Sequence, residues 1–412
     1  MNRPTGSNYG WVVVSAAFLI TFITCGINFS FGVFILPIVN EMGWSRGLVS
    51  SVMLVAGAVY GITLLVTGPL SERYGYKWVL GASTVFLGIG LLLSSQIHEI
   101  WQLYVFNGLF IGLSIAASYA IPVALVALWF TRRQGLAVGV ATLGVSLGTA
   151  FVPLVISSLI STFNWRTTLV IAGIAVIAIS IPSVLLIRQP PSLLRQQEEQ
   201  ARDDGTDSEN TWIGLTLGEA VRRGRFWVLF IVLLIFLTAL SLTMLHLVPY
   251  AIDSGISPIQ AAALLTLVGI FGIAGRLISG VASDKYGVKP VMLCGLILLT
   301  LITVMLALRQ QDWPFYIFAA LFGLGYSSVA TMMVRMTRYV FGIKALGPIF
   351  SILMIADGIG LGIGPWLAGY IFDITGGYYI TFIAVAISLA IAAVLTAVMK
   401  PATIKTTGIH LI

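Results

Sequence analysis

The sequence predicts an all-α integral membrane protein with twelve transmembrane helices in two pseudo-symmetric bundles of six. Three observations support this fold class. The chain is 58% hydrophobic and only 9% charged, with a mean hydropathy of +1.01, whereas a soluble domain is about half apolar and about a quarter charged. Its apolar residues form long separate runs, and its second half repeats the first at a constant offset.

Twelve apolar runs reach the length of about 20 residues that a membrane-spanning helix needs. They cover residues 11–38, 47–69, 78–97, 101–130, 136–160, 166–187, 226–250, 258–281, 289–308, 313–337, 346–370 and 378–399. A polar segment after the sixth run forms a central loop (188–225). It separates an N-terminal bundle (1–187) from a C-terminal bundle (226–412). In this loop Thr216 and Glu219 have the spacing of a capping box, so we expect a short interfacial helix before span 7.

The basic residues predict the orientation in the membrane. Eighteen of the 22 lysines and arginines lie in the termini, in the central loop or in loops after even-numbered spans. The opposite loops hold only Arg46, Arg166 and Arg309, and Arg276 lies within a span. Loops rich in Lys and Arg stay in the cytoplasm, so both termini are predicted to be cytoplasmic. The net charge of +7 is therefore a feature of the loops and does not indicate a nucleic-acid partner.

The two halves align at an offset of 212 residues, at which "GPLSERYGYK" (68–77) matches "GVASDKYGVK" (280–289). Further matched pairs are Pro37 with Pro249, Glu41 with Asp253, Gly57 with Gly269, Gly148 with Gly360 and Pro153 with Pro365. Such duplication is common in secondary transporters. It also gives a test: a residue needed for packing in both halves should recur, whereas a residue that serves one asymmetric ligand site need not.

Arg276 is specific to the second half, because its counterpart in the first half is Leu64. The planar fork of an arginine matches a carboxylate through two hydrogen bonds, and Gly272 and Gly275 leave space beside it. We interpret Arg276 as a substrate-binding residue. The alternative is that its side chain extends to the nearby cytoplasmic surface.

Asp357 is the one acidic residue that we place deep within a span, and its counterpart is Val145. An acid near the bilayer midplane is costly and normally faces the bundle interior with a partner. We interpret Asp357 as a proton-coupling site and Arg276 as its charge partner. The alternatives are a purely structural Arg–Asp pair and a helix-packing role beside "GIGLGIGP".

Four other polar residues within spans are candidates for the site. His246 lies near the outer end of span 7, and an unperturbed pKa of about 6.5 would suit a proton-linked gate; a hydrogen-bonded interfacial histidine is the alternative. Tyr119, Asn28 and Tyr326 lie near mid-span depth. Each could donate a hydrogen bond to a carboxylate, and each could equally be ordinary packing. Cys25 and Cys294 lie in apolar runs and are interpreted as apolar residues, not as a disulfide or metal site.

The repeated loop sequences at 68–77 and 280–289 resemble the loop motif of the major facilitator superfamily, in both expected places. The stretches at 8–20, 129–144, 246–257 and 271–280 resemble its prokaryotic monocarboxylate transporter and oxalate/formate antiporter branch. The resemblance implies the major facilitator fold, an anion-binding role for Arg276 and a prokaryotic inner or plasma membrane. It further implies that four loop charges close the cytoplasmic side in the outward-open state: Glu72, Arg73, Asp284 and Lys285.

The sequence departs from its relatives at two positions. Oxalate/formate antiporters place a lysine where this chain has Asp357, and animal monocarboxylate transporters place an acid where it has Gly272. Arg276 with Asp357 is neutral, so one monoanion plus one proton keeps a low-dielectric site neutral. We therefore predict a proton-coupled symporter of small monocarboxylates such as L-lactate or pyruvate. It would act by alternating access, as a monomer, without a cofactor or metal ion.

Three other functions remain possible from the sequence. An anion exchanger of the oxalate/formate type would run by counterflow without a pH gradient. A facilitator for another small organic or amphipathic solute would not need Arg276. A transporter-like sensor would usually carry an added soluble domain. No catalytic triad, nucleotide loop or metal cluster is recognisable, so an enzyme is not expected.

Overall fold

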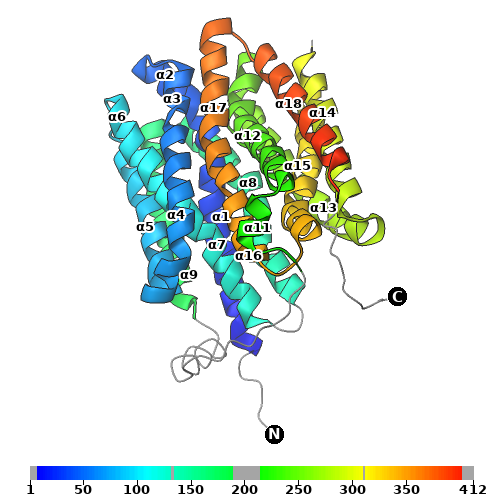
Figure 1. The fold of residues 1–412 in the computed structure, drawn as a ribbon. Coiled ribbons are helices and arrows are strands. Elements are labelled where there is room, and N and C mark those ends of the chain that lie inside the picture. The colour runs from blue at the N-terminus through cyan, green and yellow to red at the C-terminus, as the bar shows by residue number, and fades with distance from the viewer. Residues whose placement is uncertain (1–6, 131–133, 189–213, 310, 401–412) are drawn as a thin grey trace, which may run out of the picture.

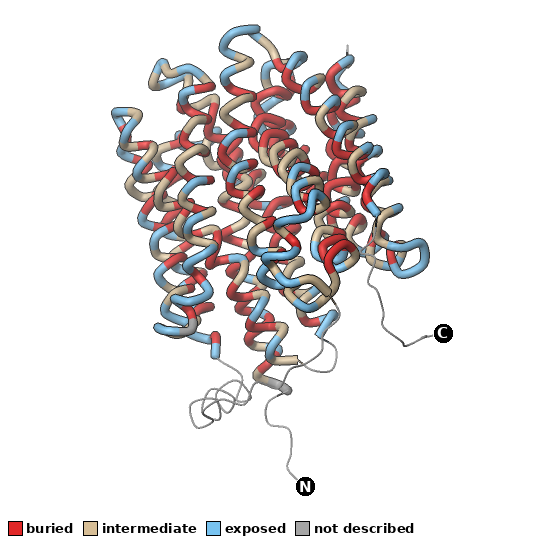
Figure 2. Tube along the Cα trace, in the orientation of Figure 1, coloured by how far each residue is buried: buried red, intermediate tan, exposed pale blue. Residues whose placement is uncertain are grey.

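The structure, a computed structural model, describes residues 7–130, 134–188, 214–309 and 311–400. In this part of the chain the secondary structure is helical apart from one isolated bridge between Gly214 and Gly342. Twelve helical segments are long and apolar enough to cross a membrane, so the chain is a multi-pass membrane protein. They stand side by side as one elongated bundle (Figure 1), with buried residues along their inner faces (Figure 2).

The helices of the first half are α1 (Ser7–Phe29) with α2 (Phe31–Met42), α3 (Arg46–Ser50) with α4 (Val52–Tyr74), α5 (Tyr76–Ser94), α6 (Ile100–Leu103) with the π-helix η1 (Tyr104–Leu109) and α7 (Phe110–Trp129), α8 (Gln134–Thr162) and α9 (Trp165–Leu186). Those of the second half are α12 (Gly224–Asp253), α13 (Pro258–Tyr286), α14 (Val288–Ala307), α15 (Trp313–Phe341), α16 (Leu346–Leu353) with α17 (Ile355–Thr375), and α18 (Tyr379–Val398). All twelve predicted spans are confirmed.

Between the halves the structure confirms the short helix predicted from the capping box, α11 (Leu217–Val221). The Thr216 hydroxyl accepts a hydrogen bond from the Glu219 amide, and the Glu219 carboxylate accepts one from the Thr216 amide at 2.8 Å. That backbone hydrogen bond lowers the pKa of Glu219. The amide of Leu215 donates to the Phe341 carbonyl at 2.9 Å, so the segment before α11 is joined to the end of α15.

Span 11 is interrupted at Met354, between α16 and α17. The interruption places Asp357 in the first turn of α17, a position that span length alone does not reveal. Met354 itself keeps helical dihedral angles and donates to the Phe350 carbonyl at 2.9 Å, and the Asp357 amide donates to the Met354 carbonyl at 2.9 Å. The span is therefore bent at this point and not unwound.

The two halves meet along two seams, α4 against α17 and α8 against α13. Both seams are closest at a glycine of the repeat. A Cβ added at Gly57 would lie 2.3 Å from the Gly358 carbonyl oxygen, and one added at Gly269 would lie 2.5 Å from the Ser146 carbonyl oxygen. The duplicated glycines therefore allow the backbones of the two halves to touch near mid-span.

Beyond mid-span, the described residues of the two halves also approach each other closely at one end of the bundle. We call this the closed end; it carries α2, α3 and the loops at 254–257 and 376–378, at the top of Figure 1. There, a Cβ added at Gly32 would lie 2.3 Å from the Leu245 carbonyl oxygen, and one at Gly369 would lie 2.7 Å from the Arg46 carbonyl oxygen.

At the opposite end, the termini end, five glycines of the seam helices would meet nothing within 4 Å among the described residues if they carried a Cβ: Gly61, Gly68, Gly135, Gly139 and Gly280. In the described part of the chain, the close backbone contacts between the halves thus lie near mid-span and at the closed end.

Candidate functional site

Arg276 lies on α13 and reaches across the seam to α8. Its Nη1 donates to the Thr142 carbonyl oxygen at 3.2 Å, and the side chain is half-buried. A guanidinium has five N–H donors, so this contact leaves most of them for a ligand. Among the residues that the structure describes, no carboxylate lies within ion-pair distance of Arg276.

Asp357 lies on the other seam. Its Oδ2 accepts a hydrogen bond at 2.9 Å from the hydroxyl of Tyr60, a buried residue of α4. The predicted Arg276–Asp357 pair is therefore wrong for this structure. The physical reason is that α13 packs against α8 whereas α17 packs against α4. Sequence reasoning missed Tyr60, although its counterpart in the repeat is Gly272 and the asymmetry test would have selected it.

Tyr119 of α7 connects the two seams. Its side chain is 46% exposed, yet it lies close enough to Arg276, Asp357 and Tyr326 to interact electrostatically with all three. Tyr119 of the first half is therefore part of the electrostatic surroundings of three residues of the second half. We call Arg276, Thr142, Tyr60, Asp357 and Tyr119 the central site.

The other two predicted mid-span residues are placed differently. Tyr326 is buried on α15, and a Cβ added at Gly272, one turn from Arg276, would lie 3.1 Å from the Tyr326 hydroxyl. Tyr326 thus packs against α13 one turn before the arginine. Asn28 is half-buried in the last turn of α1, and the described contacts do not connect it to the central site.

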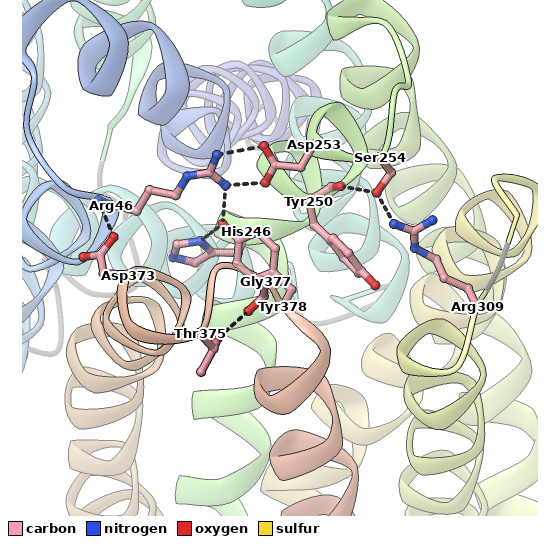
Figure 3. A network of polar contacts seen from close by, with 10 residues as sticks. All are labelled: Arg46, His246, Tyr250, Asp253, Ser254, Arg309, Asp373, Thr375, Gly377 and Tyr378. Carbon is pink, nitrogen blue, oxygen red and sulfur yellow. Dashed lines mark hydrogen bonds and ion pairs between the residues drawn. The ribbon is translucent and has the colours of Figure 1, made fainter.

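His246 is not at the central site. It is fully buried near the closed end, where Nδ1 lies 2.9 Å from the Tyr378 hydroxyl (Figure 3). Its Nε2 lies 2.9 Å from the Pro365 carbonyl oxygen. The Ser50 hydroxyl of the other half is 3.2 Å from Nε2. The structure therefore separates His246 from Arg276 and places it at the contact between the halves.

Arg46 of α3 makes the strongest contacts at the closed end. Its guanidinium forms a two-bond ion pair with Asp253 of α12, with Nη2 and Oδ1 2.7 Å apart, and it donates to the Tyr378 hydroxyl at 3.2 Å (Figure 3). The backbone amides of Arg46 and Gly47 donate to the Asp373 carboxylate at 3.0 and 2.7 Å.

The guanidinium also lies 3.8 Å above the ring centroid of Phe372. We call Arg46, Asp253, Asp373, Tyr378 and His246 the latch, because its contacts join the two halves. Two weak sequence signals pointed to it. Arg46 is one of the few basic residues in the loops opposite the termini, and Asp253 is the counterpart of Glu41.

The predicted gating charges lie at the termini end and do not join the halves in the part of the chain that is described. Asp284 accepts a hydrogen bond at 2.8 Å from Arg335 of its own half. Arg73 lies over the ring of Tyr74, and Lys285 over that of its own neighbour. The side chain of Glu72 lies outside the described residues. These positions agree with an open termini end.

The comparison with known proteins gives one consistent family. The model of the Major Facilitator Superfamily matches residues 17–280 and again 247–408. Monocarboxylate transporter 12 of Rattus norvegicus is 24% identical over 427 residues, which cover 96% of this chain and 86% of that protein. Monocarboxylate transporter 13 of Bos taurus is 28% identical over 386 residues, which cover 92% and 87%.

Among solved structures, a bacterial homologue of the human lysosomal transporter Spinster matches with a TM-score of 0.74 at 15% identity, over 95% of this chain and 96% of that one. This match supports the fold alone. The curated relatives named above are mammalian, so the prokaryotic branch stays a prediction. The family match covers both halves, and the chain therefore belongs to the Major Facilitator Superfamily, as a twelve-span membrane transporter related to monocarboxylate transporters and not as an enzyme.

Proposed function

We propose that this transporter is a proton-coupled symporter of small monocarboxylates, such as L-lactate or pyruvate. It works by alternating access, as a monomer, with the proton as coupling ion and without a cofactor. One observation carries the proposal. Arg276 extends into the contact between the halves, and the described residues provide it with a carbonyl oxygen but no carboxylate.

A cation inside the membrane is costly unless it is paired. A substrate carboxylate would supply the missing charge and bind the guanidinium through two parallel hydrogen bonds. Tyr119, which is accessible and within electrostatic range of Arg276, would donate a hydrogen bond to the same anion. The relatives named monocarboxylate transporters support this class of substrate.

We assign the binding of the coupling proton to Asp357. With a monocarboxylate on Arg276, an ionised Asp357 leaves the central site with one negative charge in a low-dielectric setting. Protonation of Asp357 removes that charge. Tyr60 holds the carboxyl at 2.9 Å and keeps it in place in either protonation state, because a phenol can donate or accept.

We further propose that the termini end is cytoplasmic, on the basis of the loop lysines and arginines. The closed end then faces outward, and the conformation is inward-open. We also propose that the protein lies in the inner or plasma membrane of a prokaryote.

Uptake of radiolabelled L-lactate into proteoliposomes tests the function. We expect an inward proton gradient to drive accumulation, which a protonophore abolishes, and we expect pyruvate to compete more strongly than oxalate. Uptake that ignores the proton gradient and requires oxalate or formate inside the vesicle would identify an anion exchanger instead. Competition by uncharged amphipathic solutes would identify the facilitator.

A further inference from the structure

The hydrogen bonds that connect His246 to the ion pair of the latch have a direction that can be assigned. The Pro365 carbonyl can only accept, so Nε2 at 2.9 Å carries a proton. In a neutral ring Nδ1 is then an acceptor, and the Tyr378 hydroxyl at 2.9 Å donates to it. The Tyr378 oxygen in turn accepts from Arg46 Nη1 at 3.2 Å. The chain runs from Arg46 to Tyr378, to His246 and to Pro365.

Tyr378 keeps its proton at physiological pH. Its side chain is only 2% exposed, and burial raises the pKa of its phenol, against the opposing effect of Arg46. It is therefore an obligatory donor to Nδ1 as long as His246 is neutral. The Ser50 hydroxyl, 3.2 Å from Nε2, adds a second contact from the first half.

The charged groups around His246 come from several elements. Arg46 of α3 opposes a proton on the ring, and Asp373 of α17 favours one. Both acids of the latch are already bound, Asp253 by the Arg46 guanidinium and Asp373 by two backbone amides of α3. Three further acids of the described residues lie at this end, each with a partner of its own half: Glu41 pairs with Arg166 at 2.8 Å, Asp312 lies 4.0 Å from Arg309, and Glu99 accepts from the Trp101 indole at 2.6 Å. The Arg309 guanidinium lies over the ring of Tyr250.

We propose that His246 is a pH sensor for the latch, and that a proton on its Nδ1 opens the closed end. A protonated ring has two donors, so Nδ1–H would point at the Tyr378 oxygen that already accepts from Arg46. The phenol proton would then lose its acceptor in a fully buried place, and the imidazole ring, which is itself fully buried, would carry a charge without access to water. Separation of the halves relieves both, because it admits water to the ring and to the phenol.

The proton therefore binds more strongly to the state in which the latch is open, and linkage makes the closed state less stable as the pH falls. One consequence rests on the proposed symport. While the closed end is shut, His246 does not hold the coupling proton, so Asp357 carries it to the termini end. Opening of the latch itself does not depend on which substrate is carried.

Double electron–electron resonance between spin labels on the two halves tests the sensor. The labels replace Asn40 and Ile259, which are exposed at the closed end and outside the latch, in a chain with Cys25 and Cys294 changed to alanine. The full-length protein is measured without substrate at about pH 8 and about pH 5.5. We expect the ratio of long to short distances to rise about tenfold at the lower pH. That pH is about one unit below the ordinary pKa of a histidine, where the binding of one proton can shift an equilibrium between two states by about this factor at most.

Two variants and one matched control make the result specific. His246→Gln keeps an N–H donor but cannot be protonated, and should remove the pH response. Tyr378→Phe keeps the ring and the ion pair but disconnects them from the histidine, and should weaken the response even if His246→Gln fails to fold. His98→Gln changes an exposed histidine at the same end and should leave the response intact.

An unchanged pH response in His246→Gln or Tyr378→Phe would overturn the proposal, as would its loss in His98→Gln. The result is separable from the proposed function. Uptake driven by a proton gradient together with pH-independent distances would reject only the sensor. A pH-dependent opening without proton-driven uptake would reject only the symport.

Discussion

The two seams between the halves share one feature and differ in another. Gly57 of α4 lies against Gly358 of α17, and its counterpart Gly269 of α13 lies against Ser146 of α8, the counterpart of Gly358. Backbone contact near mid-span is thus duplicated. Towards the termini end, however, the first seam carries Asp357, the residue before Gly358, and the second carries Arg276, about two turns after Gly269.

This difference separates packing from ligand binding. Close approach of two helices demands a small residue in both halves, so Gly57 and Gly269 agree. A site for an anion and a proton demands opposite charges on opposite walls. Arg276 therefore corresponds to Leu64, and Asp357 corresponds to Val145.

The closed end shows the same divergence. Glu41 pairs with Arg166 inside the first half, at 2.8 Å. Its counterpart Asp253 pairs across the halves with Arg46, while the position of Arg166 is occupied by Tyr378. Since Tyr378 is neutral, the second acid is available to a cation of the other half. The two halves thus differ at both cation positions, because Arg166 corresponds to Tyr378 and Arg46 corresponds to Pro258.

The largest expected effect comes from making the two seams alike. Arg276→Leu installs the residue of the first half and should lower L-lactate uptake about 100-fold or more, because loss of a buried charge partner costs about 2–5 kcal/mol. Arg276→Lys keeps the charge but loses the fork and should lower uptake about tenfold. Arg222→Leu, at an exposed arginine, is the control. Near-normal uptake by Arg276→Leu would exclude carboxylate binding there.

The shared glycines should be sensitive to any added methyl group. Gly57→Ala and Gly269→Ala should each lower the stability of the purified protein by about 1–3 kcal/mol, because the Cβ would overlap the opposite backbone. Gly61→Ala, one turn along α4 with nothing within 4 Å, should have no cost. Thermal unfolding of the three variants measures this, and equal melting temperatures would contradict the packing of the seams.

Asp357→Asn should separate transport from coupling. The amide can still accept from Tyr60 but cannot carry a proton, so we expect about a tenfold loss of gradient-driven uptake and retained exchange of labelled for unlabelled lactate. Tyr60→Phe should have a smaller effect in the same direction. Asp312→Asn, at an exposed acid, is the control. If Asp357→Asn still accumulates lactate, another group carries the proton.

The smallest effect is expected at the pair of acids near the closed end. Asp253→Asn weakens an ion pair between the halves and should raise the open population about fivefold at pH 8, which corresponds to about 1 kcal/mol. Glu41→Gln weakens the equivalent pair inside one half and should leave that population unchanged. The spin labels at positions 40 and 259 measure the open population of both variants. An equal rise in the two variants would contradict the distinction between an ion pair that joins the halves and one that lies within a half.

Most of the architecture followed from local pattern. Each span and the capped helix α11 were predicted because hydropathy and capping are properties of neighbouring residues. The repeat singled out Arg276 and Asp357 because the offset compares residue types without coordinates. Tyr60 and Arg46 were missed, since their partners lie 297 and 207 residues away in the chain. The repeat, which sets Tyr60 against Gly272 and Arg46 against Pro258, marks both as different between the halves but does not name their partners.

The sequence by itself determined the twelve spans, the duplication and the residues on which the two halves differ. Tertiary structure alone decided which of those residues meet. It put Arg276 and Asp357 on different seams with Tyr119 between them, and it moved His246 from the predicted substrate site to the latch. The physical reason is that hydropathy places a residue in depth along one helix, whereas partners across a membrane bundle are set by helix rotation and by which helices pack together.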